Sequence, residues 1–502
     1  MNADQFRAAA HAAIEDIISY HATLESRPVV APVSPGYLAP QMPTSAPAAP
    51  EGWDTIRPDI ESLIMPGLTH WQHPNFMAFF PSNSSYPAIL GELYSAALSA
   101  PAFNWLCSPA ITELETVVLD WVAKAIGLPA GFLSSGEGGG VIQGSASEAI
   151  VTVMVAARER MLRRRAEGCT EEAAEAVKDA YRGRLVALGS SQAHSSTHKG
   201  AIIAGTKFRS VTVRLEDEFA MTGEGLKAAL LECKAEGLVP YYLTVSLGTT
   251  ATCAVDQFAE IAEVLKEWPD VWVHVDAAYA GAALVCPEYQ HFSAQFGAFD
   301  SFDFNMHKWL LTNFDASCLF IQKRSDLTSA LSITPSYLRN EFSDSGLVTD
   351  YRDWQIPLGR RFRALKIWFV LRSYGLEGLR AHIRRHITLG KMFAELVESR
   401  GDLFFIITPP AFALTVLTVR PFVVMDFKGD GNLEAGNRLT KKVADIIAAK
   451  GEAFLTSSTV EGVVAIRVVA GTPAVEEHHL RRVFDLLVEA AEEVVRQERN
   501  RA

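Results

Sequence analysis

Basic residues are in the minority in this chain, and cysteines are few. Its 502 residues include 46 basic and 58 acidic side chains, and the formal charge of -12 argues against nucleic acid or an anionic membrane surface as the main partner. The six cysteines are Cys107, Cys169, Cys233, Cys253, Cys286 and Cys318. They lack the spacing of a metal site or a redox pair, so we expect reduced thiols in the core of a cytoplasmic protein. A small-molecule substrate fits this composition best.

Export signals, long apolar runs and internal repeats are also missing. Asp4, Glu15 and Asp16 lie early in an amphipathic pattern, whereas a signal peptide begins with a basic and then an apolar segment. The most hydrophobic window, residues 403–425, is interrupted by three prolines and an arginine. We therefore expect two core strands there instead of a membrane span.

One short motif, Asp426 to Gly431, superficially resembles a calcium-binding loop. Its third position is Lys428, and its twelfth is Asn437 where such a loop has glutamate. A turn before a helix is the better interpretation, and we expect no metal site in this protein.

Three regions follow from the pattern of helices, strands and prolines. Residues 1–85 combine helical periodicity over 6–24 with a connector rich in proline and alanine over 28–50, which is typical of a helical arm that packs on another surface. Residues 86–375 alternate short apolar strands with helices, which indicates an α/β domain with a mostly parallel sheet. Residues 376–502 predict a smaller α+β domain that ends in a long helix.

Lys308 stands in the apolar stretch 304–311, where a lysine needs a partner or a chemical task. Upstream, Asp276 ends a predicted strand over 271–275. A desolvated lysine and an aspartate at a strand end are typical of a pyridoxal 5'-phosphate (PLP) site, because the amine can bind the aldehyde while the carboxylate keeps the ring nitrogen protonated. A structural ion pair between the two side chains is the alternative.

A glycine cluster at residues 136–140 leads into Gly144-Ser145-Ala146-Ser147, directly before a predicted helix. Free N–H groups and the helix dipole favour an anion at such a place, and the hydroxyls of Ser145 and Ser147 add donors for a phosphate. The alternative is a serine N-cap after a flexible loop.

Two further residues follow predicted strands of the same domain. His194 comes after the strand at 185–188, and Thr250 comes after the strand at 241–246. Ligands of open α/β sheets collect at the carboxyl edge, so these residues are expected to lie near Asp276 and Lys308. An imidazole there could stack on a cofactor ring, although a histidine held by local hydrogen bonds is the alternative.

With these motifs the chain resembles the PLP-dependent aromatic L-amino acid decarboxylases, a group that includes histidine decarboxylases and the plant tryptophan and tyrosine decarboxylases. The resemblance is strong over about residues 1 to 390 and weak beyond. The segments that carry it are His70-Trp71-Gln72, Ser108-Pro109-Ala110, Thr112 to Glu115, Gly136 to Ala149, His194, His274 to Gly281, Asn305 to Trp309 and Asp353 to Phe362. It implies a type I PLP-dependent transferase fold, similar to aspartate aminotransferase, with a seven-stranded sheet in the large domain. It also implies a homodimer with shared active sites.

The resemblance assigns a role to each residue of the site. Lys308 would bind PLP covalently, Asp276 would pair with the ring nitrogen, and His194 and Ala278 would lie on opposite faces of the ring. The residues around the phosphate and the rest of the cofactor would be Ser145, Ala146, Ser147, Thr250, Asn305 and His307. Met306 stands where many relatives have proline, and we expect this to alter only the local backbone.

Tyr337 lies in the segment 333–339, which matches a catalytic loop of the family and would donate a proton to the substrate Cα. Relatives with phenylalanine at this position tend to form aldehydes, so Tyr337 favours an amine product. An exposed loop tyrosine is the alternative for this residue. For the whole protein, an aldehyde synthase, an aminotransferase and a non-catalytic interaction protein are the rival functions.

An apolar wall for an aromatic substrate is also implied, partly donated by a second subunit. Its members would be Trp71, Phe79, Phe80, Pro81, Ser82, Phe103 and Trp105, although some of these aromatics could be plain core residues. Phe79 and Ser82 replace the tyrosine and threonine of animal relatives, which weakens any inference of catechol preference. Gly359 stands where plant relatives that accept indoles have glycine. We therefore expect L-tryptophan or 5-hydroxytryptophan as substrate, with tyrosine, DOPA or phenylalanine as alternatives.

Overall fold

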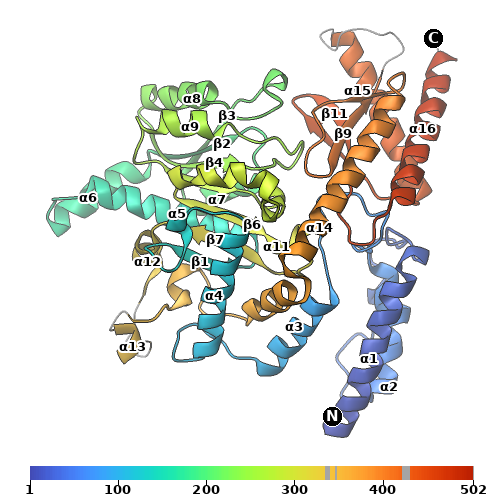
Figure 1. Ribbon diagram of the computed structural model, residues 1–502, viewed down its shortest axis with the longest axis horizontal. Helices are drawn as coiled ribbons and strands as arrows, with labels where there is room; N and C mark the ends of the chain where they lie inside the picture. The colour runs from blue at the N-terminus through green and yellow to red at the C-terminus, as the bar shows by residue number, and fades with distance from the viewer. Residues whose placement is uncertain (334–337, 339, 345–346, 421–429, 501–502) are drawn as a thin grey trace.

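A seven-stranded mixed sheet forms the centre of the protein (Figure 1). The structure is a computed structural model that describes the chain except residues 334–337, 339, 345–346, 421–429 and 501–502. The strands are β1 (Gly139–Gln143), β2 (Leu185–Ser190), β3 (Lys207–Val211), β4 (Val239–Ser246), β5 (Trp272–Asp276), β6 (Ser301–Asn305) and β7 (Ser317–Ile321). Their order is β1-β7-β6-β5-β4-β2-β3, and only the two pairings of β7 are antiparallel. The prediction of an α/β domain with a mostly parallel seven-stranded sheet is confirmed.

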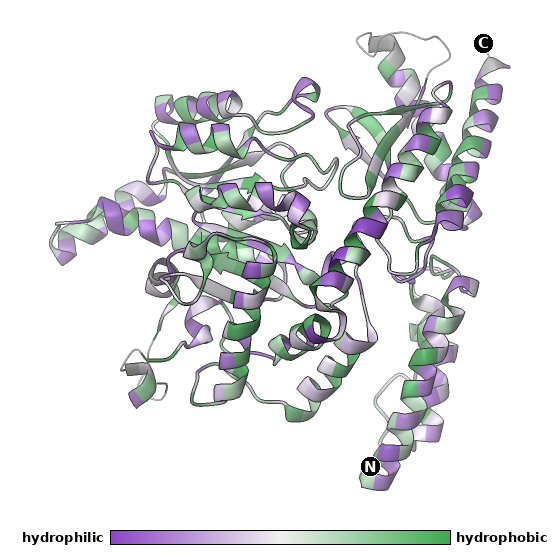
Figure 2. Ribbon diagram, in the orientation of Figure 1, coloured by the Kyte–Doolittle hydropathy of each residue, from purple (hydrophilic) through white to green (hydrophobic). Residues whose placement is uncertain are grey.

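Helices cover both faces of this sheet, and the strands are accordingly hydrophobic (Figure 2). In β2, Val186 and Leu188 enter one apolar cluster while Leu185 and Ala187 enter another, as the alternation of side chains along a strand requires. The helices of this region are α3 (Tyr86–Leu98), α4 (Pro109–Ala125), α5 (Ala146–Arg165), α6 (Glu171–Arg182), α7 (Ser195–Ile203), α8 (Gly223–Ala235), α9 (Phe258–Leu265), α10 (Gln290–Ser293), α11 (Met306–Trp309), α12 (Arg324–Leu331) and α13 (Glu341–Asp344).

A second, antiparallel sheet lies toward the C-terminus. It contains β8 (Phe404–Ile406), β9 (Leu414–Val419), β10 (Thr456–Val460) and β11 (Val463–Val469), with α15 (Asp430–Lys450) and α16 (Glu477–Arg499) beside it. Strands β8 and β9 occupy part of the hydrophobic window, as expected. None of the helices in the described part of the chain combines the length and apolar character needed to cross a membrane. Most of the Asp426 to Gly431 motif lies outside the described residues.

The long helix α14 (Arg363–Ser399) joins the two sheets (Figure 1). The sequence predicted a helix beginning near residue 375, but the structure has helix on both sides of Gly375. This glycine interrupts the helix with φ 60° and ψ 175°, a conformation that a side chain would disfavour. The domain boundaries at 85 and 375 stay predictions.

The N-terminal arm projects from the body of the protein (Figure 1). Its helices α1 (Ala3–Thr23) and α2 (Trp53–Asp59) are joined by an ion pair of 2.6 Å between Asp16 and Arg57. Glu25 fixes the arm to α16 by accepting a hydrogen bond from Nε2 of His479 at 3.0 Å. Phe6 on α1 remains exposed, so the arm has apolar surface without cover in a single chain.

The prediction that all six cysteines lie in the core is wrong for Cys107 and Cys169, which are exposed. Cys107 follows a turn before α4, and Cys169 follows the end of α5, so both lie in connections on the surface. The other four cysteines are buried, and all six are free thiols.

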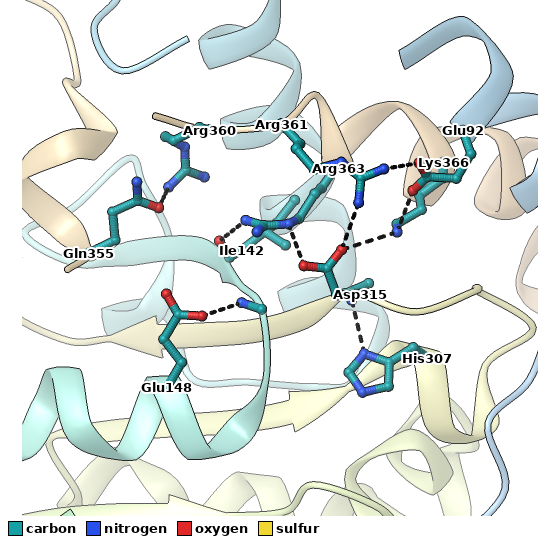
Figure 3. A network of polar contacts seen from close by, with 12 residues as sticks. Glu92, Ile142, Glu148, His307, Asp315, Gln355, Arg360, Arg361, Arg363 and Lys366 are labelled. Atoms are coloured by element: carbon teal, nitrogen blue, oxygen red, sulfur yellow. Dashed lines mark hydrogen bonds and ion pairs between the residues drawn. The ribbon is translucent and has the colours of Figure 1, made fainter. Parts of the chain in front are cut away.

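A buried ion pair fastens the segment before α14 to the large sheet. Glu115 on α4 accepts hydrogen bonds from Arg360 and, at 2.8 Å, from the backbone N–H of Ile142 in β1. Arg360 also donates to Gln355 (Figure 3) and lies 4.8 Å from the ring centre of Tyr351. Both charged side chains are at most 2% exposed, so each needs the other.

We expect Glu115→Gln to lower the free energy of unfolding by about 3 kcal/mol, because it leaves the buried guanidinium of Arg360 without a counter-charge. Urea denaturation measures the change. The control is Asp4→Asn, which removes the exposed Asp4–Arg7 ion pair and should leave the unfolding midpoint unchanged. Equal midpoints for the two variants would show that the buried pair contributes no more than a surface one.

Candidate active site

A cavity of about 230 Å³ lies at the carboxyl edge of the large sheet, where β1, β2, β4, β5 and β6 end. Its lining residues are Phe80, Ser145, Ala146, Ser147, His194, Ser196, Ser246, Gly248, Thr249, Thr250, Asp276, Ala278, Tyr279, Asn305, His307, Lys308 and Phe314. The structure thus brings together every residue that the sequence analysis assigned to the cofactor. A larger hollow of about 570 Å³ lies elsewhere, but its lining contains acidic residues such as Glu224 and Glu260 and no lysine, so it lacks the group that could bind an aldehyde.

Lys308 enters the cavity from α11, directly after β6. Its burial lowers the pKa of the amine, while the nearby carboxylates Asp276 and Asp303 oppose this effect. The described carboxylates form no ion pair with it, which argues against the structural ion pair considered above. Its Nζ instead lies 5.4 Å from the centre of the Phe80 ring. A lysine with a lowered pKa is a better nucleophile because more of it is the neutral amine.

Asp276 and His194 lie in the same cavity and have defined hydrogen bonds. Asp276 Oδ1 accepts the N–H of Ala278 at 3.0 Å, which orients the carboxylate at the end of β5. His194 is the N-cap of α7, and its Nδ1 accepts the N–H of Ser196 at 3.2 Å. Burial lowers the pKa of His194, so a neutral ring with its proton on Nε2 is expected. Local hydrogen bonds therefore hold Nδ1 and leave Nε2 for another partner.

Ser145 begins the wall of the cavity formed by α5. It is the N-cap of the helix and accepts the N–H of Glu148 at 3.2 Å, while Glu148 accepts the N–H of Gly144 at 2.9 Å (Figure 3). The N-cap that was the alternative interpretation is therefore present. It does not exclude an anion site, because a serine that accepts a hydrogen bond still has a hydroxyl proton to donate.

Asn305 and His307 lie opposite this helix start. Nδ1 of His307 accepts the N–H of Ala316 at 2.9 Å, and burial together with nearby Lys308 lowers its pKa to about 3. The ring is therefore neutral and carries its proton on Nε2. Asn305 is 4% exposed, and its Oδ1 has no hydrogen-bond partner among the described residues. Buried polar atoms are usually paired, so this orphan indicates a place for a bound group.

A network that the sequence analysis missed supports this wall from behind (Figure 3). Asp315 accepts hydrogen bonds from Arg361 at 3.2 Å and Arg363 at 3.0 Å, and Lys366 donates to Glu92 at 2.6 Å. Lys366 is only 1% exposed, although it stands in an amphipathic helix where lysines usually face water. No local pattern marks it, because its acidic partners are distant in the sequence.

The residues predicted to contact substrate are only partly at this cavity. Phe80 lines it and stacks on Tyr279 with 3.9 Å between ring centres. Trp71 and Phe79 stack on each other at 5.6 Å and are exposed outside it. The other predicted substrate contacts within the described chain that do not line the cavity are Pro81, Ser82, Phe103, Trp105 and Gly359. Tyr337 lies outside the described residues.

Comparison with known proteins places these features in a family. Residues 35–420 match the model of the pyridoxal-dependent decarboxylase conserved domain. Phenylacetaldehyde synthase of Arabidopsis thaliana is 42% identical over 98% of this chain and 96% of its own length. Tyrosine decarboxylase 2 of Narcissus pseudonarcissus is 42% identical over 98% and 95%, and aromatic-L-amino-acid decarboxylase of Bos taurus is 41% identical over 99% and 98%.

Solved structures agree with this match. The crystal structure of Oryza sativa TDC with PLP and tryptamine has a TM-score of 0.92 at 36% identity, covering 99% of both chains. The structure of Catharanthus roseus tryptophan decarboxylase in complex with L-tryptophan has a TM-score of 0.89 at 38% identity, covering 98% of this chain and 99% of the other.

The chain therefore belongs to the pyridoxal-dependent decarboxylases, within the aromatic amino acid decarboxylase family. It is a carboxy-lyase that uses PLP. The cavity fits this cofactor, because it combines a carboxylate and the start of a helix with a lysine and an Asn305 amide oxygen that have no ion-pair or hydrogen-bond partner among the described residues. The named relatives differ in substrate and product, so the family alone leaves both open.

Proposed function

We propose that this protein decarboxylates an aromatic L-amino acid to an aryl-ethylamine and carbon dioxide, with L-tryptophan or 5-hydroxytryptophan as the preferred substrate. The observation that carries the proposal is the position of Lys308, which shares a cavity with Asp276 and His194 without forming an ion pair. A non-catalytic interaction protein has no need for such a lysine, because burying an amine without an ion pair or hydrogen bond destabilises the fold.

Each residue of the cavity would contact a different part of the cofactor. Lys308 would bind the aldehyde of PLP, and Asp276 would hold a proton at the ring nitrogen. The neutral ring of His194 would lie against one face of the cofactor and Ala278 against the other. When bound, PLP supplies an electron sink for the bond between Cα and the carboxylate. Thr250 would lie beside the cofactor.

The phosphate would lie at the start of α5. Backbone N–H groups of Ala146 and Ser147, the hydroxyls of Ser145 and Ser147 and the helix dipole favour an anion there. Nε2–H of neutral His307 and the amide of Asn305 add donors from the opposite wall. A neutral histidine suits this place because it donates a hydrogen bond without adding a second positive charge beside Lys308.

Substrate selection depends on the aromatic wall. Phe80 is the predicted member that already lines the cavity, and Trp71 and Phe79 extend the apolar surface outward. A Cβ added at Gly359 would meet no atom of the same chain within 4 Å. Ile356 and Leu358 beside it are exposed. This segment is therefore available to a second subunit, whose active site it would complete.

We expect the purified enzyme to turn over L-tryptophan or 5-hydroxytryptophan with a higher kcat/KM than tyrosine or DOPA. Gly359→Ser should shift this ratio toward the phenols, because a hydroxyl at this position can bind the phenol group. Amine formation on the four amino acids, measured by chromatography, provides the values. A wild-type preference for tyrosine would contradict the assignment of the substrate, and a ratio that Gly359→Ser leaves unchanged would contradict the role of Gly359.

Tyr337 is proposed to return a proton to the substrate Cα, so that the product is an amine. We expect Tyr337→Phe to reduce amine output by at least about tenfold, in line with the usual contribution of a general acid, and to raise aldehyde, peroxide and ammonia. Product analysis after complete turnover of L-tryptophan measures both channels. If both enzymes form only the amine, Tyr337 has no role in the mechanism. If both enzymes form the aldehyde, the aldehyde synthase alternative is favoured.

We further propose that the active protein is a homodimer. Helix α3 exposes Leu90, Leu93 and Tyr94, at 45%, 50% and 55%, and the projecting arm exposes Ile14 and Ile18 of α1. Apolar surface on two neighbouring elements is typical of an interface between subunits. A second copy of the chain would cover both.

We expect Leu93→Glu to shift the protein from dimer to monomer and to lower its activity, because a charge in the interface opposes its burial. Light scattering measures the mass. Leu231→Glu is the matched control: Leu231 is 51% exposed on α8, away from α3 and the arm, and its replacement should leave the dimer intact. An active wild-type monomer would overturn the proposal.

A further inference from the structure

A second carboxylate, that of Asp303, lies on the strand next to Asp276. Asp303 is in register with Asp276 on the neighbouring parallel strand β6, and strands lie only about 4.8 Å apart. The side chain of Asp303 is fully buried. The mechanism described above assigns no task to it, although an aspartate in a closed core is costly unless its charge is used.

A directed chain of hydrogen bonds ends on Asp303. Trp272 donates its indole N–H to Oγ of Ser301 at 2.8 Å. Because this oxygen accepts from Trp272, its own hydroxyl proton can be donated to Nδ1 of His274, which lies 2.8 Å away. Nε2 of His274 then carries the ring proton and donates it to Oδ1 of Asp303 at 3.0 Å. In this arrangement Asp303 accepts the hydrogen bond from His274, as an ionised carboxylate does.

The other oxygen of Asp303 has no such support. Oδ2 is buried and has no hydrogen-bond partner among the described residues. A carboxylate that served only to anchor His274 would need one oxygen, and an amide would provide it without a buried charge. The unsupported oxygen therefore indicates a role for the charge itself.

The groups that act electrostatically on Asp303 come from each neighbouring element. They are His274 and Asp276 on β5, Lys308 on α11, Tyr242 on β4 and Cys318 on β7. Tyr242 and Cys318 are buried, and burial raises the pKa of each, so both are neutral at pH 7. Asp276 and Lys308 are the neighbours that face the cavity.

We propose that Asp303 is a positioning residue for the electron sink. Its negative charge, held in place by His274, adds to the charge of Asp276 and raises the pKa of the PLP ring nitrogen. This inference rests on the proposed pairing of Asp276 with that nitrogen. Asp303 acts through the field at Asp276 and does not line the cavity. The negative charge of Asp303, one strand away from Asp276, stabilises a protonated ring nitrogen because the region between them has a low dielectric constant.

The pH dependence follows from the state of Asp303. Burial and the charge of Asp276 raise the pKa of Asp303 to about 6, although the hydrogen bond from His274 opposes them. The charge is therefore present above about pH 6 and lost below it. Since the pKa in the folded state exceeds the ordinary value of 3.8, the folded state binds more protons between these two pH values. The ionised side chain then lowers stability at pH 7, where the charge would be used.

The test uses the holoenzyme loaded with PLP that carries ¹⁵N in its ring, because the ¹⁵N chemical shift reports the proton on this atom. We expect Asp303→Asn, which keeps an acceptor for His274 but removes the charge, to lower the apparent pKa of the ring nitrogen by on the order of one unit. We also expect kcat to fall with little change in KM. The wild-type enzyme should lose activity as the pH falls below about 6, where Asp303 loses its charge, and Asp303→Asn should not show this loss. The thermal midpoint at pH 7 should not decrease.

Asp300→Asn is the matched control. Asp300 immediately precedes β6, accepts the N–H of Val273 at 2.8 Å and pairs with Arg160, so its replacement should leave the ¹⁵N titration unchanged. If Asp303→Asn fails to fold, Asp303→Ser removes the same charge with a smaller polar side chain.

Asp276→Asn separates failure of this inference from failure of the proposed function. If this variant keeps the nitrogen protonated as in the wild type, the pairing of Asp276 with the cofactor is wrong. If Asp276→Asn loses the proton while Asp303→Asn titrates like the wild type, only the role of Asp303 is overturned. A lower thermal midpoint for Asp303→Asn with an unchanged ¹⁵N titration would show a structural role alone.

Discussion

Burial of the large sheet on both faces is the constraint on which the rest of the structure depends. Strands covered by helices on each side must be apolar along their length, as in β2 and β7, so polar side chains can gather only where the strands end. Five strands end at the same edge, and their polar residues form one cavity. Asp303 and His274 also lie inside the covered part of the sheet, where a carboxylate next to an imidazole is costly to bury.

Charge is unevenly compensated around the cavity. Beside the cavity, Asp315 and Glu92 form ion pairs with the buried Lys366 and its arginine neighbours. Inside the cavity, Lys308 is left without an ion pair while two carboxylates act on it from adjacent strands. A fold selected only for stability would close such a gap. Its persistence is physically consistent with a site that completes its electrostatics by binding a cofactor.

Much of this site could be predicted from the sequence, because Lys308, Asp276, His194 and Ser145 each follow an apolar run that is readable as a strand or precede a readable helix. Asp303 could not be recognised in this way. It lies within the short strand Ser-Phe-Asp-Phe-Asn, where an alternating pattern does not distinguish a solvent face from a buried polar one. The proposed role of Asp303 depends on its position beside Asp276, and this position follows from the register between β5 and β6, which cannot be read from the sequence.

The fold was predictable where local patterns are strong and less so where long-range packing decides. The mostly parallel sheet followed from alternating helices and strands, and the helix predicted to begin near residue 375 is present after Gly375, but the helical segment before this glycine, residues 363–374, was not predicted. Exposure of Cys107 and Cys169 was missed for a related reason. Cysteine is usually buried, and the composition does not show that these two fall in connections between helices.

The cavity of a single chain is small for the reaction proposed above. Sites for small molecules usually measure about 300 to 1,000 Å³, whereas this one has about 230 Å³. Under the proposed function it must accommodate a cofactor and then an aromatic side chain, and of the aromatic residues proposed to contact substrate Phe80 lines it whereas Trp71 and Phe79 do not. Trp71 and Phe79 are exposed in a single chain, and as members of the proposed substrate wall they would need a cover that excludes water during decarboxylation. In the proposed homodimer, the exposed segment around Gly359 and the exposed face of α3 are the surfaces from which a second copy of the chain could supply that cover.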